Sequence, residues 1–458
     1  MLAPLLVGTQ RIWSPDRRSL RRSILRLALP MVAEQLLTTL VGIVNMMLVS
    51  RLGREATAAV GLSGTPFNLS IALFLGLGIG TTALIARAAG AGKESEVEAV
   101  TRQSFWMGLV AALLVSTLYW ATAPQIMHVM GADAAVTPLG VTYLRWSALG
   151  FLPMQWSQVM YGALRGRGDT LTPLKIGLVV NILNGLLSYA LIWGRFGLPA
   201  LGLKGGPIGE ASAFAVGALL VALFLFRSEG SVRLRWHTLF QVDLGLIGRI
   251  LKVGLPTAGE RVLGSLGMIS FTRMIASLGT VAIAAHQITM NAESIAYMPA
   301  QALAAAGTAL VGMRLGAKEP DGATQVAKET VLLTALTMAL TASFFVVGGG
   351  PYIRLYTGDL LMGALAVQML RIAALSEIPM GITFALSGTL RGAGDTMPMM
   401  LVTAAGVWVV RLSVAALLIF GLKWGLAGAW TAMIFDWLFR MGFAAWRFRL
   451  GKWRTIKV

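Results

Sequence analysis

A seven-residue segment occurs twice in this chain, with the two copies 226 residues apart. Residues 164–170 read LRGRGDT and residues 390–396 read LRGAGDT, and each copy separates two long apolar runs. The same offset aligns Leu29-Pro30 with Leu255-Pro256, Glu34 with Glu260, Gly53 with Gly279, Leu144-Arg145 with Leu370-Arg371, and Pro153-Met154 with Pro379-Met380. The chain therefore consists of two halves built on one plan.

The apolar runs predict an all-α polytopic membrane protein. Hydrophobic residues make up 56% of the chain and charged residues 13%, whereas a soluble domain carries about 25% charged residues. A helix of about 20 apolar residues crosses the hydrocarbon core. We predict twelve spans, at 26–50, 60–86, 103–123, 140–163, 172–194, 207–227, 250–272, 279–312, 329–348, 365–389, 398–420 and 425–446.

The basic residues predict the orientation of these spans. If the N-terminus lies in the cytoplasm, 26 of the 38 lysines and arginines fall on the cytoplasmic side and 7 on the outside. Short cytoplasmic loops are enriched in these residues. We therefore expect a multi-pass protein of the cytoplasmic membrane, with both termini inside. The net charge of +18 then indicates contact with the lipid bilayer, and not with nucleic acid.

The repeat also predicts the domain organisation. We expect a cytoplasmic tail at 1–25, an N lobe of six spans at 26–227 and an inter-lobe loop at 228–249. A C lobe of six spans at 250–446 and a basic cytoplasmic tail at 447–458 follow. Because each half has an even number of spans, the repeats are parallel, an arrangement that occurs in secondary transporters around a midplane cavity. The chain has no Walker A sequence, so we expect an ion gradient to supply the energy.

Several short sequences together resemble one transporter family over residues 24–446. They are Leu29-Pro30, Arg51-Leu52-Gly53, Gly90-Ala91-Gly92-Lys93, both LRGxGDT segments, Asn184 with Leu191-Ile192-Trp193-Gly194, and Ala284-Ala285-His286-Gln287. In combination they resemble the multidrug and toxic compound extrusion (MATE) family, of the bacterial type. The resemblance implies two six-helix lobes and the export of amphipathic, often cationic compounds by Na⁺ or H⁺ antiport. It implies neither an enzyme activity nor a cofactor, and we expect a monomer.

The chain departs from this family at two positions. One bacterial branch uses acidic residues in spans 1 and 5, and the matching positions here are Asn45 and Ser188. Because neither side chain carries a charge at neutral pH, an N-lobe proton site of that type is not expected. Asn45 and Asn184 stay candidates for the ion-coupling or substrate cavity.

Acidic residues within the C-lobe spans are the main candidates for ion coupling. Glu260, Glu293 and Glu377 lie in spans 7, 8 and 10. An ionisable residue inside a membrane span costs free energy, so it is by default a candidate for a functional role. Carboxylate oxygens are ligands that suit a hard cation, so the three predict a Na⁺ site. The repeat offset aligns Glu293 with Phe67 and Glu377 with Phe151. This asymmetry points to the C lobe.

Each acid also has a structural interpretation. Glu260 could pair with Arg261 or Arg273, Glu377 with Arg371, and Glu293 could form an interhelical hydrogen bond. Glu34 is duplicated as Glu260, which favours a structural role near the cytoplasmic gate over ion coupling. Asp436 and Arg440 are four residues apart, which favours an intrahelical pair, and Asp436 could also pair with Arg411. The Gly76–Gly80 run favours helix packing over a phosphate loop.

The duplicated heptads are predicted to be cytoplasmic hinges. Their glycines suit a tight turn, and Asp169 and Asp395 can cap the helices that follow. Arg165 and Arg391 belong to the same hinge segments.

Three other functions remain open. A flippase for a lipid-linked substrate of a related two-lobe fold would need a basic cavity, for which Arg145, Arg261, Arg371 and Arg411 are the candidates. A membrane-embedded prenyl transferase would need an Asp-rich magnesium motif, which the sequence lacks. A passive channel would never concentrate its substrate.

Overall fold

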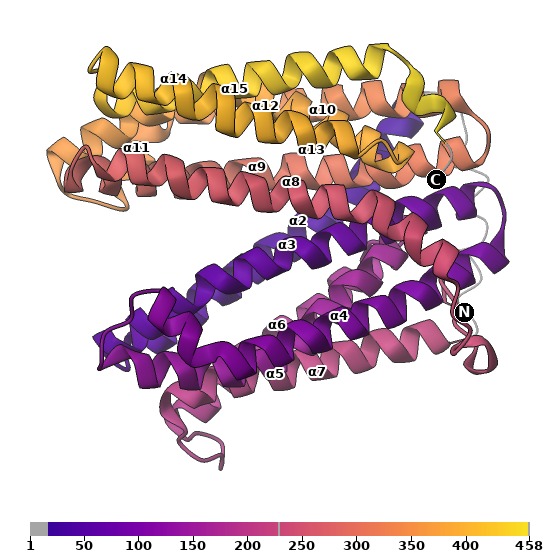
Figure 1. The fold of residues 1–458 in the computed structure, drawn as a ribbon, viewed down its shortest axis with the longest axis horizontal. Coiled ribbons are helices and arrows are strands. Elements are labelled where there is room, and N and C mark those ends of the chain that lie inside the picture. The colour runs from indigo at the N-terminus through magenta and orange to yellow at the C-terminus, as the bar shows by residue number, and fades with distance from the viewer. Residues whose placement is uncertain (1–16, 228–229, 457–458) are drawn as a thin grey trace. The chain divides into compact units, whose positions relative to one another are not determined.

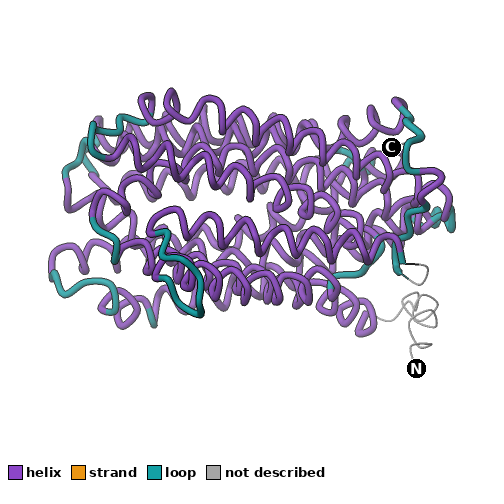
Figure 2. The backbone as a smooth tube through the Cα atoms, turned by 90° about the horizontal axis from the view of Figure 1, so that it is seen from below, coloured by secondary structure: helices purple, strands orange, loops and turns teal. Residues whose placement is uncertain are grey.

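The computed structural model describes residues 17–227 and 230–456, which form helices joined by short loops and contain no strand (Figure 2). The parts of the predicted tails at 1–16 and 457–458, and residues 228–229 of the predicted inter-lobe loop, lie outside the described residues. The all-α prediction is confirmed.

The first half of the chain forms six long helices and one short one. They are α2 (Arg17–Ser50), α3 (Arg54–Gly90), α4 (Glu94–Val129), α5 (Val136–Gly166), α6 (Leu171–Trp193), η1 (Gly202–Lys204) and α7 (Gly205–Phe226).

The second half repeats this order. It contains η2 (Trp236–Thr238), α8 (Leu244–Ala276), α9 (Thr280–Gly316), α10 (Pro320–Val347), α11 (Gly349–Arg354), α12 (Leu360–Ala393), α13 (Met397–Ala404), η3 (Ala405–Arg411), α14 (Leu412–Ala416), η4 (Leu417–Gly421), α15 (Gly425–Arg449) and η5 (Lys452–Thr455). The four elements from α13 to η4 form one continuous helical run. The segments η3 and η4 are π-helical.

The twelve predicted spans match twelve helical runs, so the two-lobe membrane fold is confirmed. Among the described residues, nine runs are long and apolar enough by themselves to cross a membrane. The helices α5, α8 and α15 complete the set. Several helices continue past the predicted ends: α2 begins at Arg17, within the predicted tail 1–25, and α8 begins at Leu244, within the predicted loop 228–249. The predicted spans are shorter because they cover only the apolar residues that cross the hydrocarbon core, whereas charged residues can continue the helix outside it.

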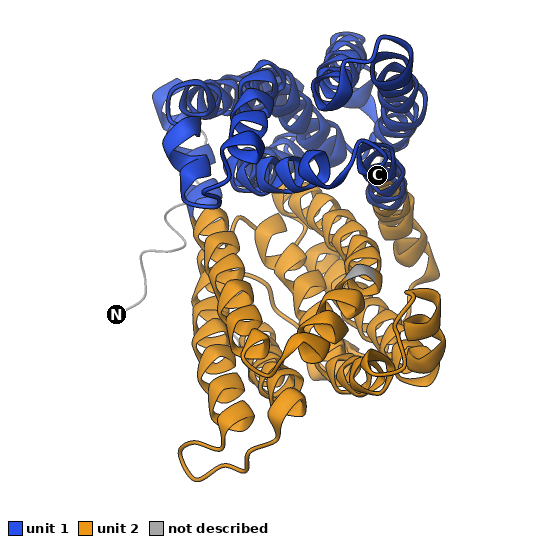
Figure 3. Cartoon of the chain, turned by 90° about the vertical axis from the view of Figure 1, so that its left-hand side faces the viewer, with its two compact units in different colours: residues 1–29, 259–458 blue, residues 30–258 orange. Residues whose placement is uncertain are grey.

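The chain divides into two compact units, which Figure 3 shows in two colours. Unit 1 contains residues 1–29 and 259–458, and unit 2 contains residues 30–258. These limits differ from the predicted lobes, which divide between 227 and 250. Each division falls inside a helix, in α2 next to Pro30 and in α8 close to Pro256.

Close packing by glycines explains why the first part of α8 belongs to unit 2. A Cβ atom on Gly76 of α3 would lie 2.5 Å from the carbonyl oxygen of Gly254, and one on Gly80 would lie 2.5 Å from that of Ile250. Small residues let helix backbones approach this closely. The interpretation of the Gly76–Gly80 run as a packing surface is therefore confirmed. Arg249 adds an ion pair to Glu96 of α4, with an N–O distance of 3.0 Å.

A second ion pair, between residues that do not align with Arg249 and Glu96 in the repeat, joins the first part of α2 to unit 1. The Nε atom of Arg21 lies 2.6 Å from a carboxylate oxygen of Glu329 on α10. Within unit 1, α9, α10 and α15 all pack against α12 (Figure 1). In unit 2, α3, α4 and α7 pack in the same way against α5.

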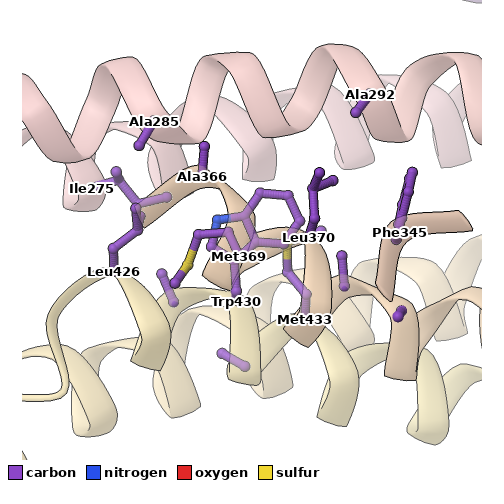
Figure 4. Close-up of a cluster of buried hydrophobic side chains, with 14 of the residues drawn as sticks. Ile275, Ala285, Ala292, Phe345, Ala366, Met369, Leu370, Leu426, Trp430 and Met433 are labelled. Carbon is purple, nitrogen blue, oxygen red and sulfur yellow. The ribbon is translucent and has the colours of Figure 1, made fainter. Parts of the chain in front are cut away.

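An apolar core fills one end of unit 1. Its largest buried side chain, Trp430 of α15, lies among Met369 and Leu370 of α12 and Met433 of its own helix (Figure 4). Ala285 and Ala292 of α9 cover this cluster with small side chains. The core holds α9, α12 and α15 together, and these three helices also carry the acidic residues of the candidate site.

Candidate functional site

Glu377 is the most buried of the predicted coupling residues. Its side chain on α12 has no exposed surface, and neither carboxylate oxygen has a hydrogen-bond partner among the described residues. The predicted alternative partner, Arg371, is exposed and forms no ion pair with it. Pro379 follows two residues later and has no N–H, so the carbonyl of Leu375 lacks its helical donor. Burying a carboxylate without partners in a membrane span costs free energy, so Glu377 is a candidate for a functional role.

Glu293 lies near Glu377, on the neighbouring helix α9. It is 3% exposed, and its charge interacts with those of Glu377 and Arg411. The hydrogen bond to another helix, which was its structural alternative, is absent from the described interactions. The structure therefore brings two of the three predicted C-lobe acids together.

A buried group of three charges lies next to these acids. Asp436 of α15 accepts hydrogen bonds from Arg440 on the same helix, with an Nε–Oδ1 distance of 2.6 Å, and from Arg411 of η3, with an Nε–Oδ2 distance of 2.8 Å. Both predicted pairings of Asp436 are confirmed. Because one carboxylate faces two guanidinium groups, this cluster carries a net positive charge, which attracts Glu293.

Local backbone geometry makes room for this cluster. A Cβ atom on Gly406 would lie 2.3 Å from Oδ1 of Asp436 and 2.7 Å from Nε of Arg440. Gly406 lies in the π-helical segment η3, which ends at Arg411. Single π-helical turns are rare and are frequent at functional sites.

Aromatic side chains surround the charged groups of unit 1. His286 packs edge-on against Phe271 and Trp430, with ring centroids 6.0 and 5.6 Å away. Arg411 lies over the ring of Phe271, and Arg440 lies over that of Trp437. Cation–π contacts of this kind stabilise a buried positive charge.

The corresponding positions of unit 2 are aromatic. Phe67 and Phe151, which align with Glu293 and Glu377, stack with ring centroids 5.5 Å apart. Phe74 and Tyr119 pack against Phe151. The repeat therefore places equivalent residues side by side in both units, and only unit 1 has carboxylates there.

Glu260 has a different environment from the other two C-lobe acids. Its carboxylate accepts hydrogen bonds from Arg391, at 2.8 Å, and from Thr403, at 3.2 Å. The expected partners Arg261 and Arg273 were wrong, because the arginine of the second heptad reaches Glu260. Among the described residues, no three His, Asp or Glu side chains could together hold a metal ion. The predicted three-carboxylate grouping is therefore not formed.

The first repeat contains the same ion pair. Arg165 of the first heptad donates from Nη2 to both carboxylate oxygens of Glu34, each at 2.9 Å. Both pairs join residues 131 positions apart. The duplicated heptad thus supplies an arginine that fixes the end of one span to another span. Sequence reasoning treated these arginines as hinge residues and missed the pairing.

The two heptad aspartates have different partners. Asp169 accepts hydrogen bonds from the backbone N–H and the hydroxyl of Thr172, so its predicted capping role is confirmed. Asp395 forms a two-bond pair with Arg447, at 2.7 and 3.0 Å. The capping prediction for Asp395 was wrong, because the residue that corresponds to Thr172 is Pro398, which has no backbone N–H to donate. The pair with Asp395 raises the pKa of Arg447.

The amide candidates of unit 2 lie together. Asn45 of α2 donates to the side-chain oxygen of Asn184 on α6, at 3.3 Å, and Ser188 donates to the same oxygen, at 3.0 Å. Ser188 also contacts the carbonyl of Gly206. The network is uncharged.

Sequence reasoning missed one acid of unit 2. Glu210 lies in the first turns of α7 and forms no hydrogen bond or ion pair within the described residues, and its charge interacts with Tyr143 of α5. The available signal was a single acid in an apolar span, which should have made Glu210 a candidate site residue like the C-lobe acids.

The fold agrees with comparisons to known proteins. The MatE family model matches residues 30–190 and again residues 256–417, which is once for each repeat. The chain belongs to the MatE family.

Curated relatives of this MatE chain match almost its whole length. It is 29% identical over 441 residues to a protein of Thermotoga maritima named probable multidrug resistance protein NorM, covering 95% of this chain and 93% of that protein. It is 30% identical over 406 residues to multidrug resistance protein MdtK of Edwardsiella ictaluri, with 87% of each chain covered. A solved structure described as the outward-facing conformation of a multidrug resistance MATE family transporter aligns with a TM-score of 0.88, at 22% identity, over 95% of this chain and 97% of that one.

Proposed function

We propose that this MatE protein is a cation-coupled antiporter that exports amphipathic, cationic organic compounds by alternating access across the cytoplasmic membrane. Relatives named as multidrug resistance proteins support the class of substrate. The observation that carries the proposal is the pair of buried carboxylates, Glu293 and Glu377, in unit 1.

The charges of unit 1 favour the exchange of one positive charge. The buried acids Glu293, Glu377 and Asp436 lie close to two buried arginines, Arg411 and Arg440. When all three acids are ionised, the group carries one net negative charge. A proton, a Na⁺ ion or a cationic substrate would each neutralise it, so ion and substrate compete and each lowers the affinity for the other.

The roles within this site follow from the contacts. Glu377 is the primary coupling residue because its oxygens are unpartnered. Glu293 shares the charge, and the Asp436 cluster holds Arg411 beside it. Glu260 and Glu34 position the ends of their spans through Arg391 and Arg165. The Asn45–Asn184 network contributes neutral polar atoms to unit 2.

Transport in inverted vesicles tests the proposal. Export of a fluorescent organic cation is measured under a Na⁺ gradient alone and under an H⁺ gradient alone. We expect one of the two gradients to drive accumulation, and Glu377→Gln to abolish it. If the Glu377→Gln variant still accumulates the compound and the Glu210→Gln variant does not, the coupling residue lies in unit 2. Equilibration without accumulation under either gradient would indicate a passive channel.

The flippase alternative is less well supported. Of its four candidate arginines, Arg411 is paired with Asp436, Arg145 contacts the Trp120 carbonyl and ring, Arg261 donates to Gln301, and Arg371 is exposed. Within unit 1, these contacts do not gather Arg261, Arg371 and Arg411 into one site for a pyrophosphate.

A further inference from the structure

An apolar groove lies within unit 1, apart from the acidic site. It is a cavity of about 480 Å³ between the α13–η3 run and α15. Its lining includes Met397, Leu401 and Ala405 on the first run and Phe439, Phe443 and Arg447 on α15, together with Pro398, Val402 and Trp446. All but Arg447 are apolar.

The spacing of these residues shows how the groove runs. On α13–η3 they recur every four residues from Met397 to Ala405, and on α15 every four residues from Phe439 to Arg447. Eight residues of helix span about 12 Å, which is less than half of the ~30 Å hydrocarbon core. The groove thus reaches inward from the basic end of α15 by less than the depth of one leaflet.

Positive charge is concentrated in sequence at the end of α15 that lines the groove. Arg447 lines it and is held by Asp395. Later in the chain, Arg449 and Lys452 are exposed, and neither side chain forms an ion pair among the described residues. Trp446, which also lines the groove, is 54% exposed, and exposed tryptophans are enriched at the membrane–water interface.

We propose that this groove binds an acyl chain of an anionic phospholipid, whose phosphate lies against Arg449 and Lys452. The apolar walls suit a hydrocarbon chain, and the uncompensated cations at one end suit a negative headgroup. Basic pockets between membrane helices recognise anionic lipids in this way. The same charges repel the cationic compounds of the proposed transport function, so the groove is a lipid site, separate from the transport pathway.

Two variants separate the acyl chain from the headgroup. Leu401→Trp fills the groove, and Val409→Trp is its control because Val409 is exposed on the same run and does not line the groove. Arg449→Gln with Lys452→Gln removes the headgroup charges. Its control is Lys318→Gln with Lys328→Gln, which removes two exposed lysines from the same unit.

Native mass spectrometry of the purified full chain measures the binding of added phosphatidylglycerol and phosphatidylcholine. We expect the wild type and both controls to bind phosphatidylglycerol selectively. Each cation near the surface contributes about a five-fold factor, so the double charge variant should bind on the order of ten- to thirty-fold more weakly. Leu401→Trp should lose binding of both lipids, while its thermal unfolding in detergent stays close to that of Val409→Trp.

Two results would overturn the proposal. Wild-type binding by a folded Leu401→Trp variant would show that the lipid does not occupy the groove. Equal affinity for the two lipids, unchanged by the double charge variant, would show that the headgroup charge is not recognised. Both outcomes are independent of whether the protein exports drugs, since the measurement involves no transport.

Discussion

Phe67 stacks on Phe151 in unit 2, with ring centroids 5.5 Å apart, at the positions where unit 1 has Glu293 and Glu377. The repeat therefore preserves the contact between two helices and changes its chemistry. An aromatic pair stabilises a core by burial and ring geometry. Two carboxylates at the same place repel each other unless a cation or a nearby arginine compensates. This difference between the halves is the reason why the proposed ion coupling is assigned to unit 1.

Glu377→Gln is expected to abolish gradient-driven export and to leave the protein folded. The amide keeps the volume of the side chain and removes the charge that the proposed coupling ion would neutralise. Within the described part of the chain, Glu377 forms no ion pair that this change would break. Uptake of an organic cation into inverted vesicles and thermal unfolding in detergent provide the two measurements. Full export by this variant would contradict the assignment of Glu377 as the coupling residue.

Glu260→Gln is expected to lower thermal stability, because it leaves the guanidinium of Arg391 without its carboxylate. A hydrogen bond to a charged group contributes roughly 1.5–3 kcal/mol, and the pair is only partly exposed, at 14% for each side chain. The double variant with Arg391→Gln should recover part of the loss. The corresponding pair of the other repeat gives a parallel test, in which Glu34→Gln is compared with the double variant that also carries Arg165→Gln.

If the stability losses of the two single variants simply add up in the double variant, Glu260 and Arg391 do not interact. Export by the double variant at the wild-type rate would support a positioning role, whereas loss of export at restored stability would assign Glu260 to ion coupling.

Particular residues show what the sequence could predict. The 226-residue offset and the apolar runs predicted the two-lobe helical fold, because membrane helices must satisfy their own backbone hydrogen bonds. The offset also predicted that Glu293 and Glu377 replace aromatic residues. The partner of Glu260 was not predictable, since Arg391 lies 131 residues away and meets it only through tertiary packing. Arg261 and Arg273 were nearer in sequence and looked equally suitable.

Asp436→Asn is expected to be strongly destabilising. It leaves two buried guanidinium groups, on Arg411 and Arg440, without a counter-charge, and breaking a buried pair by removing one partner costs about 3–5 kcal/mol. Arg411→Met should be milder, because Asp436 keeps its pair with Arg440. Thermal unfolding in detergent checks the order of the two variants. If the Asp436→Asn and Arg411→Met variants unfold at the same temperature, Asp436 is not the central member of the cluster.

Gly76→Ala is expected to destabilise the packing of α8 on α3 in unit 2. The added methyl group would lie 2.5 Å from the carbonyl oxygen of Gly254 and 2.8 Å from Cβ of Ala258, so one of the two helices must shift. Overpacking of this kind costs about 1–3 kcal/mol. Gly61→Ala is the matched control on the same helix, because no atom of the described residues beyond its own stretch of helix lies within 4 Å of its added Cβ. Since alanine favours helix formation over glycine, the control should be neutral or slightly stabilising. If thermal unfolding gives the same result for both variants, the close approach of α3 and α8 is not what holds the first part of α8 in unit 2.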